Sequence, residues 1–256
     1  MEKIFDGVAR EYDEVRPGYP EELIEDVVRI SGVPAEGRIL EVGCGTGQAT
    51  IPFAKRGYEM LCLDIGKELV VIARRNCAPY PKVEIRNVSF EEWKPEEGFF
   101  DLLISATAFH WIPAEIGYLK AAQALKDTGS IALFWNMHPT PYTGFFSDVQ
   151  RVYRSVVPEW GDISDIPTTE EKIREREAVI DGSGLFGKVE VRRYPWSRVF
   201  TKEQYIKLLD TYSDHRSLEP PRRRELYDGI GELLEEEYGG AVTRPYLSVL
   251  YVAEKR

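Results

Sequence analysis

Short apolar runs alternate with helix-periodic segments along the first half of the chain. The runs have the length and composition of buried strands, and they lie at 38–42, 59–64, 83–88, 99–105 and 129–135. Between and before them, helices are predicted at 20–31, 47–55, 67–76 and 113–125. Strands that alternate with helices at these spacings predict right-handed βαβ units and a parallel sheet with helices on both faces.

The pattern loosens in the second half. A helix is expected near 144–157, and alternating apolar residues predict strands at 189–194 and 247–253, the second as an antiparallel partner at the end of the sheet. Thr201 and Gln204 predict a capping box. We therefore predict an α/β protein with a doubly wound, mostly parallel seven-stranded sheet, an antiparallel last strand and a helical cap. The expected divisions are a core at 1–135, cap insertions at 136–185 and 200–244, and late strands at 186–199 and 245–256.

Composition and charge narrow the function. The 256 residues, 43% hydrophobic, suffice for one sizeable core. The formal net charge of −10 disfavours a nucleic-acid substrate, and the basic run 222–224 is predicted to share a solvated helix face with the acidic run 235–237. No apolar run is long enough to span a membrane, and residues 1–6 do not resemble a signal peptide.

The cysteines and histidines argue against a metal site. Cys44, Cys62 and Cys77 form no CxxC pair, which favours a reducing, cytoplasmic location. The three histidines lack the short spacing of metal ligands, so no metal is expected.

The stretch ILEVGCGTGQAT, residues 39–50, holds the clearest functional signal. Gly43, Gly45 and Gly47 follow a predicted strand and open a predicted helix, where glycine permits positive φ and close approach of a ligand to the backbone. An acid at the strand end, Glu41, suits a ligand with a positive centre better than a pyrophosphate. Asp64 ends the second strand, where a carboxylate can accept both hydroxyls of a ribose. The pattern predicts a nucleoside-containing cofactor without an obligate phosphate.

These residues resemble a known family. LEVGCGTG, LDIG and FDLLISATAFHW are similar to the motifs of class I S-adenosylmethionine-dependent methyltransferases, whose fold is Rossmann-like. The opening FDGVAREYDEVRPGYPEEL resembles the small-molecule branch that includes trans-aconitate methyltransferase. The resemblance covers roughly residues 4–135.

The resemblance implies S-adenosylmethionine as the cofactor and assigns its contacts. Glu41 is expected near the amino group, Asp64 at the ribose hydroxyls and Ile65 against the adenine. Ser89 stands where the family often has an acid, so that the backbone of Ser89 and Phe90 is expected to contact the adenine. The remaining cofactor contacts are expected from the glycine loop, the N-terminal segment and the end of the fourth strand, namely Gly43, Cys44, Gly45, Thr46, Gly47, Tyr12, Arg16 and Ala106.

The chemistry is expected at the end of the fourth strand. His110 is the candidate for a base or for orienting the acceptor, and a structural role at the start of the next helix is weighed equally. Aromatic residues of the cap are expected to line the acceptor site or, for most of them, to form its seam with the sheet. Arg16 or Arg216 is expected to pair with an acceptor carboxylate.

The resulting interpretation is a methyltransferase that acts on a small molecule, as a monomer or homodimer and without a nucleic-acid or membrane partner. A methyltransferase acting on RNA or protein is the alternative enzyme. A non-catalytic module that binds S-adenosylmethionine or S-adenosylhomocysteine is the alternative without catalysis. The cap distinguishes them, because a narrow enclosed cap suits a small acceptor and an open basic groove suits a polymer.

Overall fold

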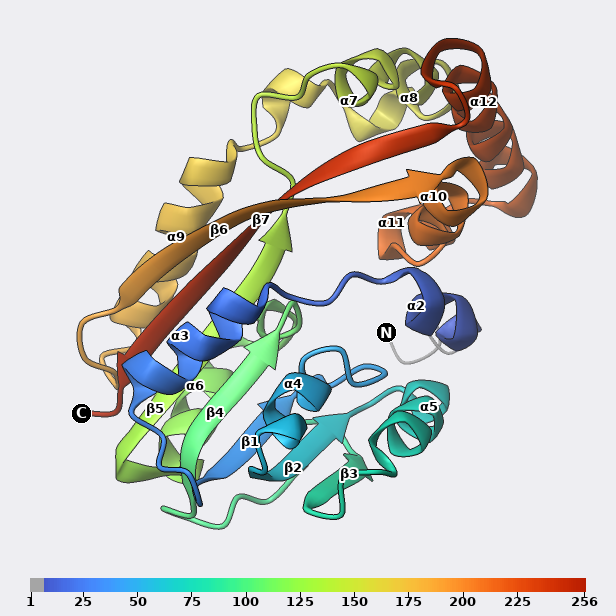
Figure 1. Cartoon of the computed structure of the whole chain (residues 1–256). Helices are drawn as coiled ribbons and strands as arrows, with labels where there is room; N and C mark the ends of the chain where they lie inside the picture. The colour runs from blue at the N-terminus through green and yellow to red at the C-terminus, as the bar shows by residue number, and fades with distance from the viewer. Residues whose placement is uncertain (1–6) are drawn as a thin grey trace.

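A computed structural model describes residues 7–256. It contains one seven-stranded sheet of order β3-β2-β1-β4-β5-β7-β6, drawn in Figure 1. The strands are β1 Arg38–Val42, β2 Glu59–Asp64, β3 Val83–Asn87, β4 Phe100–Ala106, β5 Leu125–Met137, β6 Glu190–Thr201 and β7 Ala241–Glu254. Strands β1 to β5 are parallel, and β7 runs antiparallel between β5 and β6. The predicted fold is confirmed.

The helices of the first half lie close to their predicted positions. They are α3 Glu21–Ser31, α4 Thr50–Lys55, α5 Lys67–Cys77 and α6 Ala114–Ala124. Helix α4 begins at residue 50, later than predicted, because Gly47 still has a φ of +100° and belongs to the loop. The sequence did not predict helix α2 Ala9–Val15, which precedes α3.

Side chains of alternate strand residues pack into two hydrophobic cores, one on each face of the sheet. On one face α3, α4 and α5 pack against side chains such as Ile39 and Leu102. On the other face α6 and α9 Thr169–Gly182 pack against side chains such as Leu40 and Leu103. Parallel strands covered on both faces explain why their sequences are nearly continuous apolar runs.

The last two strands are longer than predicted and reach beyond the sheet. Pairing of β7 with β5 ends at Met137 and Leu247, at the carboxyl edge of the parallel strands. Strands β6 and β7 continue their pairing as far as Thr201 and Ala241. This two-stranded extension carries the cap, as Figure 1 shows.

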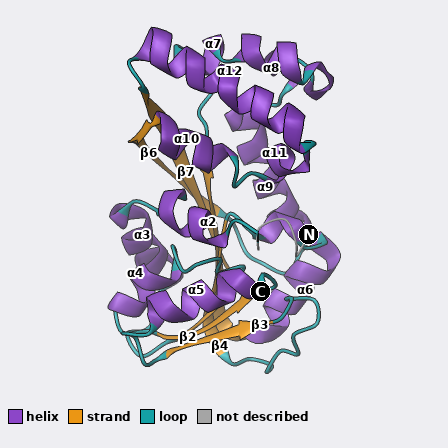
Figure 2. Cartoon of the chain, turned by 90° about the vertical axis from the view of Figure 1, so that its right-hand side faces the viewer, coloured by secondary structure: helices purple, strands orange, loops and turns teal. Residues whose placement is uncertain are grey.

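Among the described residues, five α-helices accompany the extension. They are α7 Phe145–Asp148, α8 Gln150–Val156, α10 Lys202–Leu209, α11 Ser213–Ser217 and α12 Pro220–Tyr238. The predicted capping box at Thr201 and Gln204 is confirmed at the start of α10. Buried residues of α7, α10 and α12 form a third core with the extension, and partly buried residues of α8 pack against it. Figure 2 shows α2 and α10 between the helices at the top and the parallel strands at the bottom.

The division into core and caps stays a prediction. Helix α9 lies within the segment 136–185, predicted as a cap, yet its Ile173 and Ile180 are buried in the core of the sheet. The N-terminal stretch 1–6, where the sequence lacks the features of a signal peptide, lies outside the described residues. Within residues 7–256, none of the helices combines the length and hydropathy needed to cross a bilayer.

Candidate functional site

A cavity of about 630 Å³ lies at the carboxyl edge of the parallel strands, between them and the cap. Its floor comes from the loops after β1, β2, β3 and β4, and its opposite wall comes from the segment before α11 and from β7. Loops at this edge are where open α/β sheets bind their ligands. Of the predicted site residues, twelve line it: Tyr12, Arg16, Glu41, Gly43, Cys44, Gly45, Asp64, Ile65, Ser89, Phe90, Ala106 and His110.

The glycine loop after β1 is held against the end of β2. The N–H groups of Gly43 and Cys44 both donate to the carbonyl of Leu63, at 2.8 and 3.1 Å. The Asp64 carboxylate accepts from the N–H of Gly45 and of Gly66, both at 2.8 Å. Asp64 lines the cavity beside this loop, and a carboxylate oxygen can accept more than one hydrogen bond. Asp64 is thus positioned to accept hydrogen bonds from a diol.

Position 43 requires glycine for two reasons, its positive φ and the lack of room for a side chain. Its φ is +74°, and a Cβ built there would lie 2.4 Å from the Cβ of Ala108. The loops after β1 and β4 therefore touch only because Gly43 has no side chain.

Glu41 is a buried acid beneath this loop. Its Oε2 accepts from the Thr50 hydroxyl at 2.6 Å and from the Cys62 thiol at 3.5 Å. Its Oε1 is buried and has no hydrogen-bond partner. Burial raises its pKa from 4.5 to about 7, although the hydrogen bond from Thr50 opposes the shift. A positively charged group in the cavity would complete this site and favour the ionised carboxylate.

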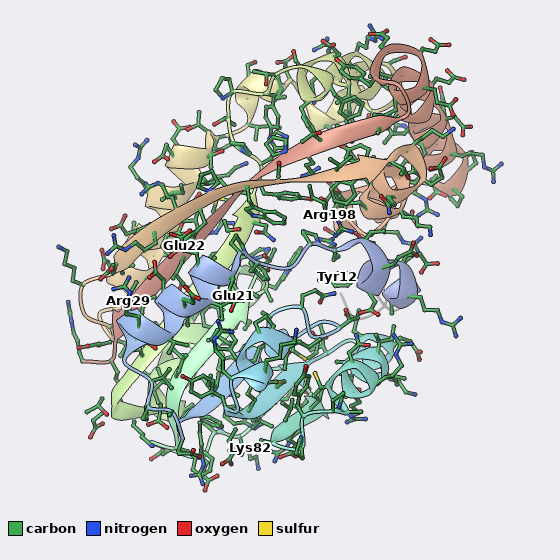
Figure 3. The ribbon with its side chains drawn as sticks, viewed as in Figure 1. Tyr12, Glu21, Glu22, Arg29, Lys82 and Arg198 are labelled. Atoms are coloured by element: carbon green, nitrogen blue, oxygen red, sulfur yellow. The ribbon has the colours of Figure 1, made fainter. Side chains whose placement is uncertain are left out.

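The N-terminal segment closes one side of the cavity. The ring of Tyr12 on α2 lies against the loop at Gly45, where an added Cβ would be 3.5 Å from it; Figure 3 labels Tyr12. Arg16 donates through Nε to the Thr211 hydroxyl at 2.8 Å and through Nη2 to the Thr211 carbonyl. Its guanidinium lies over the rings of Tyr12 and Tyr212, 4.9 and 4.6 Å from their centroids. Arg16 thus joins the N-terminal segment to the cap at the cavity wall.

The segment after β4 contains a strained residue that the sequence did not reveal. Thr107 lines the cavity with a φ of +57°, a conformation that costs a β-branched residue on the order of 1–3 kcal/mol. Its N–H donates to the carbonyl of Phe134 at 2.8 Å, and its hydroxyl is hydrogen-bonded to that of Tyr19 at 2.9 Å. These contacts hold the strained turn between Ala106 and His110 in place.

His110 faces the cavity with a defined tautomer. The indole N–H of Trp135 donates to its Nδ1 at 3.1 Å. Because that indole can only donate, Nδ1 must accept, and the proton of the neutral ring is on Nε2. Burial, with a smaller contribution from the positive charge of Arg176, lowers the pKa of His110 to about 4. At neutral pH the ring is an uncharged donor through Nε2.

Two predicted cofactor contacts do not reach the cavity. The Thr46 side chain is buried and accepts from the Gln48 amide at 2.6 Å. Gly47 donates its N–H to the Cys44 carbonyl and turns the loop into α4. The lining of the cavity does not include them. Both residues shape the glycine loop from behind, a role that the motif did not separate from direct contact.

The predicted adenine side is present in the cavity lining. Ile65 is 39% exposed there, beside Ser89 and Phe90. The ring of Phe90 is buried and stacks on Trp93, with centroids 5.9 Å apart. The Ser89 hydroxyl accepts from the N–H of Glu92 at 3.1 Å. A flat aromatic ligand has an apolar surface on this side.

The acceptor side differs more from expectation. Of the cap residues considered from the sequence, Asn136, Tyr212 and Ser213 line the cavity, whereas the rings of Phe145 and Phe146 belong to the third core. Arg216 pairs with Asp210 at 3.2 Å, which removes it as a group for an acceptor carboxylate. Three lining residues of the cap were missed: Asp214, Arg244 and Tyr246. The last two precede the predicted start of the last strand.

The cavity residues fit S-adenosylmethionine. Asp64 suits the ribose diol, and the unpartnered Oε1 of Glu41 suits an ammonium group. Ile65 and Phe90 offer an apolar surface for a purine. Among residues 7–256 there is no group of three or more metal-ligating side chains.

Comparison with known proteins supports a methyltransferase and shows its fold. The methyltransferase-domain family matches residues 39–129. An uncharacterized methyltransferase-like protein of Schizosaccharomyces pombe is 24% identical over 239 residues, which cover 90% of this chain and 86% of that protein. Other curated relatives match over about half of their own length.

Solved structures share the fold over almost the whole chain. The YcgJ protein of Bacillus subtilis has a TM-score of 0.58 at 15% identity, with 93% of this chain and 99% of that one covered. The Haemonchus contortus phosphoethanolamine N-methyltransferase 2, solved with S-adenosyl-L-methionine, has a TM-score of 0.56 at 16% identity, with 98% of this chain and 57% of that one covered. These likenesses show the fold, whereas the matched methyltransferase domain and the curated methyltransferase relatives support an S-adenosylmethionine-dependent methyltransferase.

Proposed function

We propose that the chain transfers the methyl group of S-adenosylmethionine to a small molecule that binds beside the cofactor in the same cavity. The observation that carries this proposal is that residues of the cap and of the glycine loop line one cavity. Tyr212, Asp214, Arg244 and Tyr246 of the cap face the glycine loop across it. Its volume of about 630 Å³ lies within the ~300–1,000 Å³ typical of small-molecule sites.

The charges of the cap favour a small acceptor over a nucleic acid. Arg222 of the basic run pairs with Glu159, and Arg223 approaches Asp210 at 3.5 Å. Arg151 pairs with Glu237 on the same side of the cap. Paired arginines on an acidic protein form a solvated surface rather than a track for phosphates.

The residues of the cavity have separable roles. When bound, S-adenosylmethionine supplies a methyl group activated by a positively charged sulfur. Asp64, Glu41 and the loop at 43–45 hold the cofactor, while the strained turn at Thr107 fixes the loop after β4 beside them. The cap excludes water and aligns the acceptor, which is the main requirement for an in-line displacement.

In this proposal His110 orients the acceptor and does not remove its proton. A pKa of about 4 makes its conjugate base weak, and its Nδ1 lone pair is occupied by Trp135. Its Nε2 N–H donates a hydrogen bond to an acceptor oxygen or nitrogen. Of the roles expected for His110 from the sequence, base, orienting group or structural residue, this proposal takes the orienting group.

Two finer expectations also remain proposals. We infer a cytoplasmic location because Cys44, Cys62 and Cys77 are all free thiols, as expected in a reducing compartment. The expectation of a monomer or homodimer stays a prediction.

The proposal is tested in two steps on the full chain. Calorimetric titration with S-adenosylmethionine, S-adenosylhomocysteine and, as a control, NAD should give micromolar binding for the first two and none for NAD. Release of S-adenosylhomocysteine is then measured with a panel of small carboxylic acids, amines and phenols, and in parallel with total RNA and with a protein extract. Turnover with a small molecule is expected. Turnover with RNA or protein alone would overturn the choice of acceptor, and cofactor binding without turnover on any of them would favour the non-catalytic module.

A further inference from the structure

The acceptor side of the cavity contains a positive charge without an acidic partner. Arg244 lies on β7 in the part that extends beyond the sheet. Its side chain shares the face of the strand with Val242 and Tyr246, which are buried in the third core. An arginine therefore occupies a position in a run of buried side chains, at the point where that run lines the cavity.

Aromatic rings surround this guanidinium. It lies 5.2 Å from the ring centroid of Tyr246 and 5.8 Å from those of Tyr212 and Phe146. The neighbouring tyrosines raise the pKa of Arg244 although burial opposes this, so that the group is charged at any pH of interest. The rings stabilise the charge partly, through cation–π contacts.

The hydrogen-bonding capacity of Arg244 is only partly used: its guanidinium is hydrogen-bonded to the side chain of Tyr205. The Nε of Arg244 is buried and has no partner, and the buried hydroxyl of Tyr246 has none either. Within the described chain no carboxylate lies within ion-pair distance of Arg244. Arg244 is half-buried, and a charged side chain with a buried donor is normally paired, so this exception requires a reason.

The cap contains several acidic residues, so a lack of acids does not explain why Arg244 has no carboxylate partner. Asp210 lies near both Arg216 and Arg223, and Glu159 pairs with Arg222. Asp214, the acid on the cap side of the cavity, accepts from the N–H and the Nδ1 of His215. The acids are committed to other groups, and Arg244 is left to face the cavity.

We propose that Arg244, with the hydroxyl of Tyr246, binds a carboxylate of the methyl acceptor. A guanidinium matches the two oxygens of a carboxylate, and its single charge balances a single negative charge. A phosphate has three oxygens to satisfy, and Arg16 in the same lining already uses its Nε and Nη2 donors on Thr211. This inference rests on the proposed function, because it names the class of small molecule for the same cavity.

The test compares acids with their own amides on the chain saturated with S-adenosylhomocysteine. The pairs are benzoate and benzamide, trans-cinnamate and cinnamamide, and hexanoate and hexanamide, with benzyl phosphate as a further probe; binding is measured by calorimetry. At least one acid should bind tenfold or more tightly than its amide. If no acid is preferred over its amide, or if benzyl phosphate binds tenfold more tightly than benzoate, the carboxylate assignment is wrong.

Three variants locate the effect. Arg244→Gln should weaken the preferred acid at least tenfold and leave its amide and S-adenosylhomocysteine within twofold. Arg244→Lys keeps the positive charge but loses the planar guanidinium that matches a carboxylate, so an intermediate affinity for the preferred acid is expected. The matched control is Arg198→Gln. Arg198 lies opposite Arg244 in the register of β6 and β7, but it does not line the cavity. Its side chain donates to the Val15 carbonyl, and Figure 3 labels it.

The outcomes separate this inference from the proposed function. Loss of S-adenosylhomocysteine binding in Arg244→Gln, with its melting temperature unchanged, would assign Arg244 to the cofactor and overturn the inference. Failure of the unaltered chain to bind S-adenosylhomocysteine would instead overturn the proposed function. If Arg244→Gln does not fold, the comparison of acid and amide on the unaltered chain still decides.

Discussion

The two walls of the cavity are built by different means. The cofactor wall comes from loops that follow β1, β2 and β4, and its key contacts join residues of neighbouring strands, such as Asp64 with Gly45. The acceptor wall comes from the extension of β6 and β7 and from the segment before α11. The first wall depends on a sheet whose order is common to the fold, whereas the second depends on side chains gathered from the last third of the chain. Cofactor binding is therefore a property of the fold, and acceptor choice is a property of this particular cap.

The largest expected effect is on the cofactor wall. Gly43→Ala combines left-handed strain with a contact of 2.4 Å to Ala108, and we expect a loss of roughly 2–5 kcal/mol in the free energy of unfolding, with loss of cofactor binding. Gly57→Ala is the control, because Gly57 also has a positive φ, of +87°, but its added Cβ meets no atom within 4 Å. Urea unfolding measures both. Equal losses would show that strain alone matters and that the contact between the loops after β1 and β4 does not.

The second effect concerns the charge of Glu41. Its pKa in the folded chain, about 7, lies above the unfolded value of 4.5, so the folded state binds the proton more tightly. The resulting stabilisation is complete below pH 4.5 and is lost as pH rises to 7, by on the order of 3 kcal/mol. Glu41→Gln should remove this pH dependence from the free energy of unfolding.

Cofactor binding should show the opposite dependence on pH. A positive amino group beside Glu41 favours the carboxylate, so affinity for S-adenosylhomocysteine should rise as pH increases towards 7, with release of a proton. Calorimetry in buffers of different ionisation enthalpy measures the number of protons released on binding. Affinity that is flat from pH 5.5 to 7.5 would place the amino group elsewhere.

The third effect is the loss of the acid at the end of β2. Asp64→Ala should weaken S-adenosylhomocysteine by about 1.5–3 kcal/mol, the range for hydrogen bonds to a charged group. Asp127→Ala, at a fully exposed carboxylate that pairs with Lys255, is the control. If calorimetry gives the same affinity for Asp64→Ala as for the control, the ribose does not bind at this acid.

The smallest effect lies where the two walls meet. His110→Ala should lower turnover more than affinity for S-adenosylhomocysteine, because the proposed role of its N–H is toward the acceptor. Trp135→Phe removes the donor at Nδ1 and should cost about 0.5–1.5 kcal/mol of transition-state stabilisation. With the acceptor found in the screen, turnover of the unaltered chain should show no step from His110 between pH 6 and 8, since its pKa is about 4. A step near pH 6.5 that disappears in His110→Ala would restore the histidine base.

The same contrast explains what the sequence could predict. The glycine loop and Asp64 were found because their spacing is local and each follows an apolar strand. Twelve predicted site residues line the cavity, yet the motif alone did not show that Thr46 and Gly47 turn away from it. The sequence of the loop does not distinguish the residues that line the cavity from those on its other side, because only the folded backbone sets their direction.

Arg244 was missed for a different physical reason. Its significance depends on the absence of a partner, and pairing is decided by residues far away in the sequence, such as Asp210 and Glu159. Prolines at 195 and 245 interrupt the alternating pattern, so both late strands were predicted too short. Helix α9 was missed because most of its residues are polar and only Thr169, Ile173 and Ile180 are buried.

The pairing of Thr201 with Ala241 has a consequence for how such a protein diversifies. The segment that contains helices α10, α11 and α12 begins after the last residue of β6 and ends before the first residue of β7, and these two residues are paired. Removal of the segment would require only a tight hairpin turn in its place, and the seven strands would keep their order. We therefore expect that an exchange of this segment would change the cavity wall at Tyr212 and Asp214 and the contact of Thr211 with Arg16, while Arg244 and Tyr246 would stay on β7.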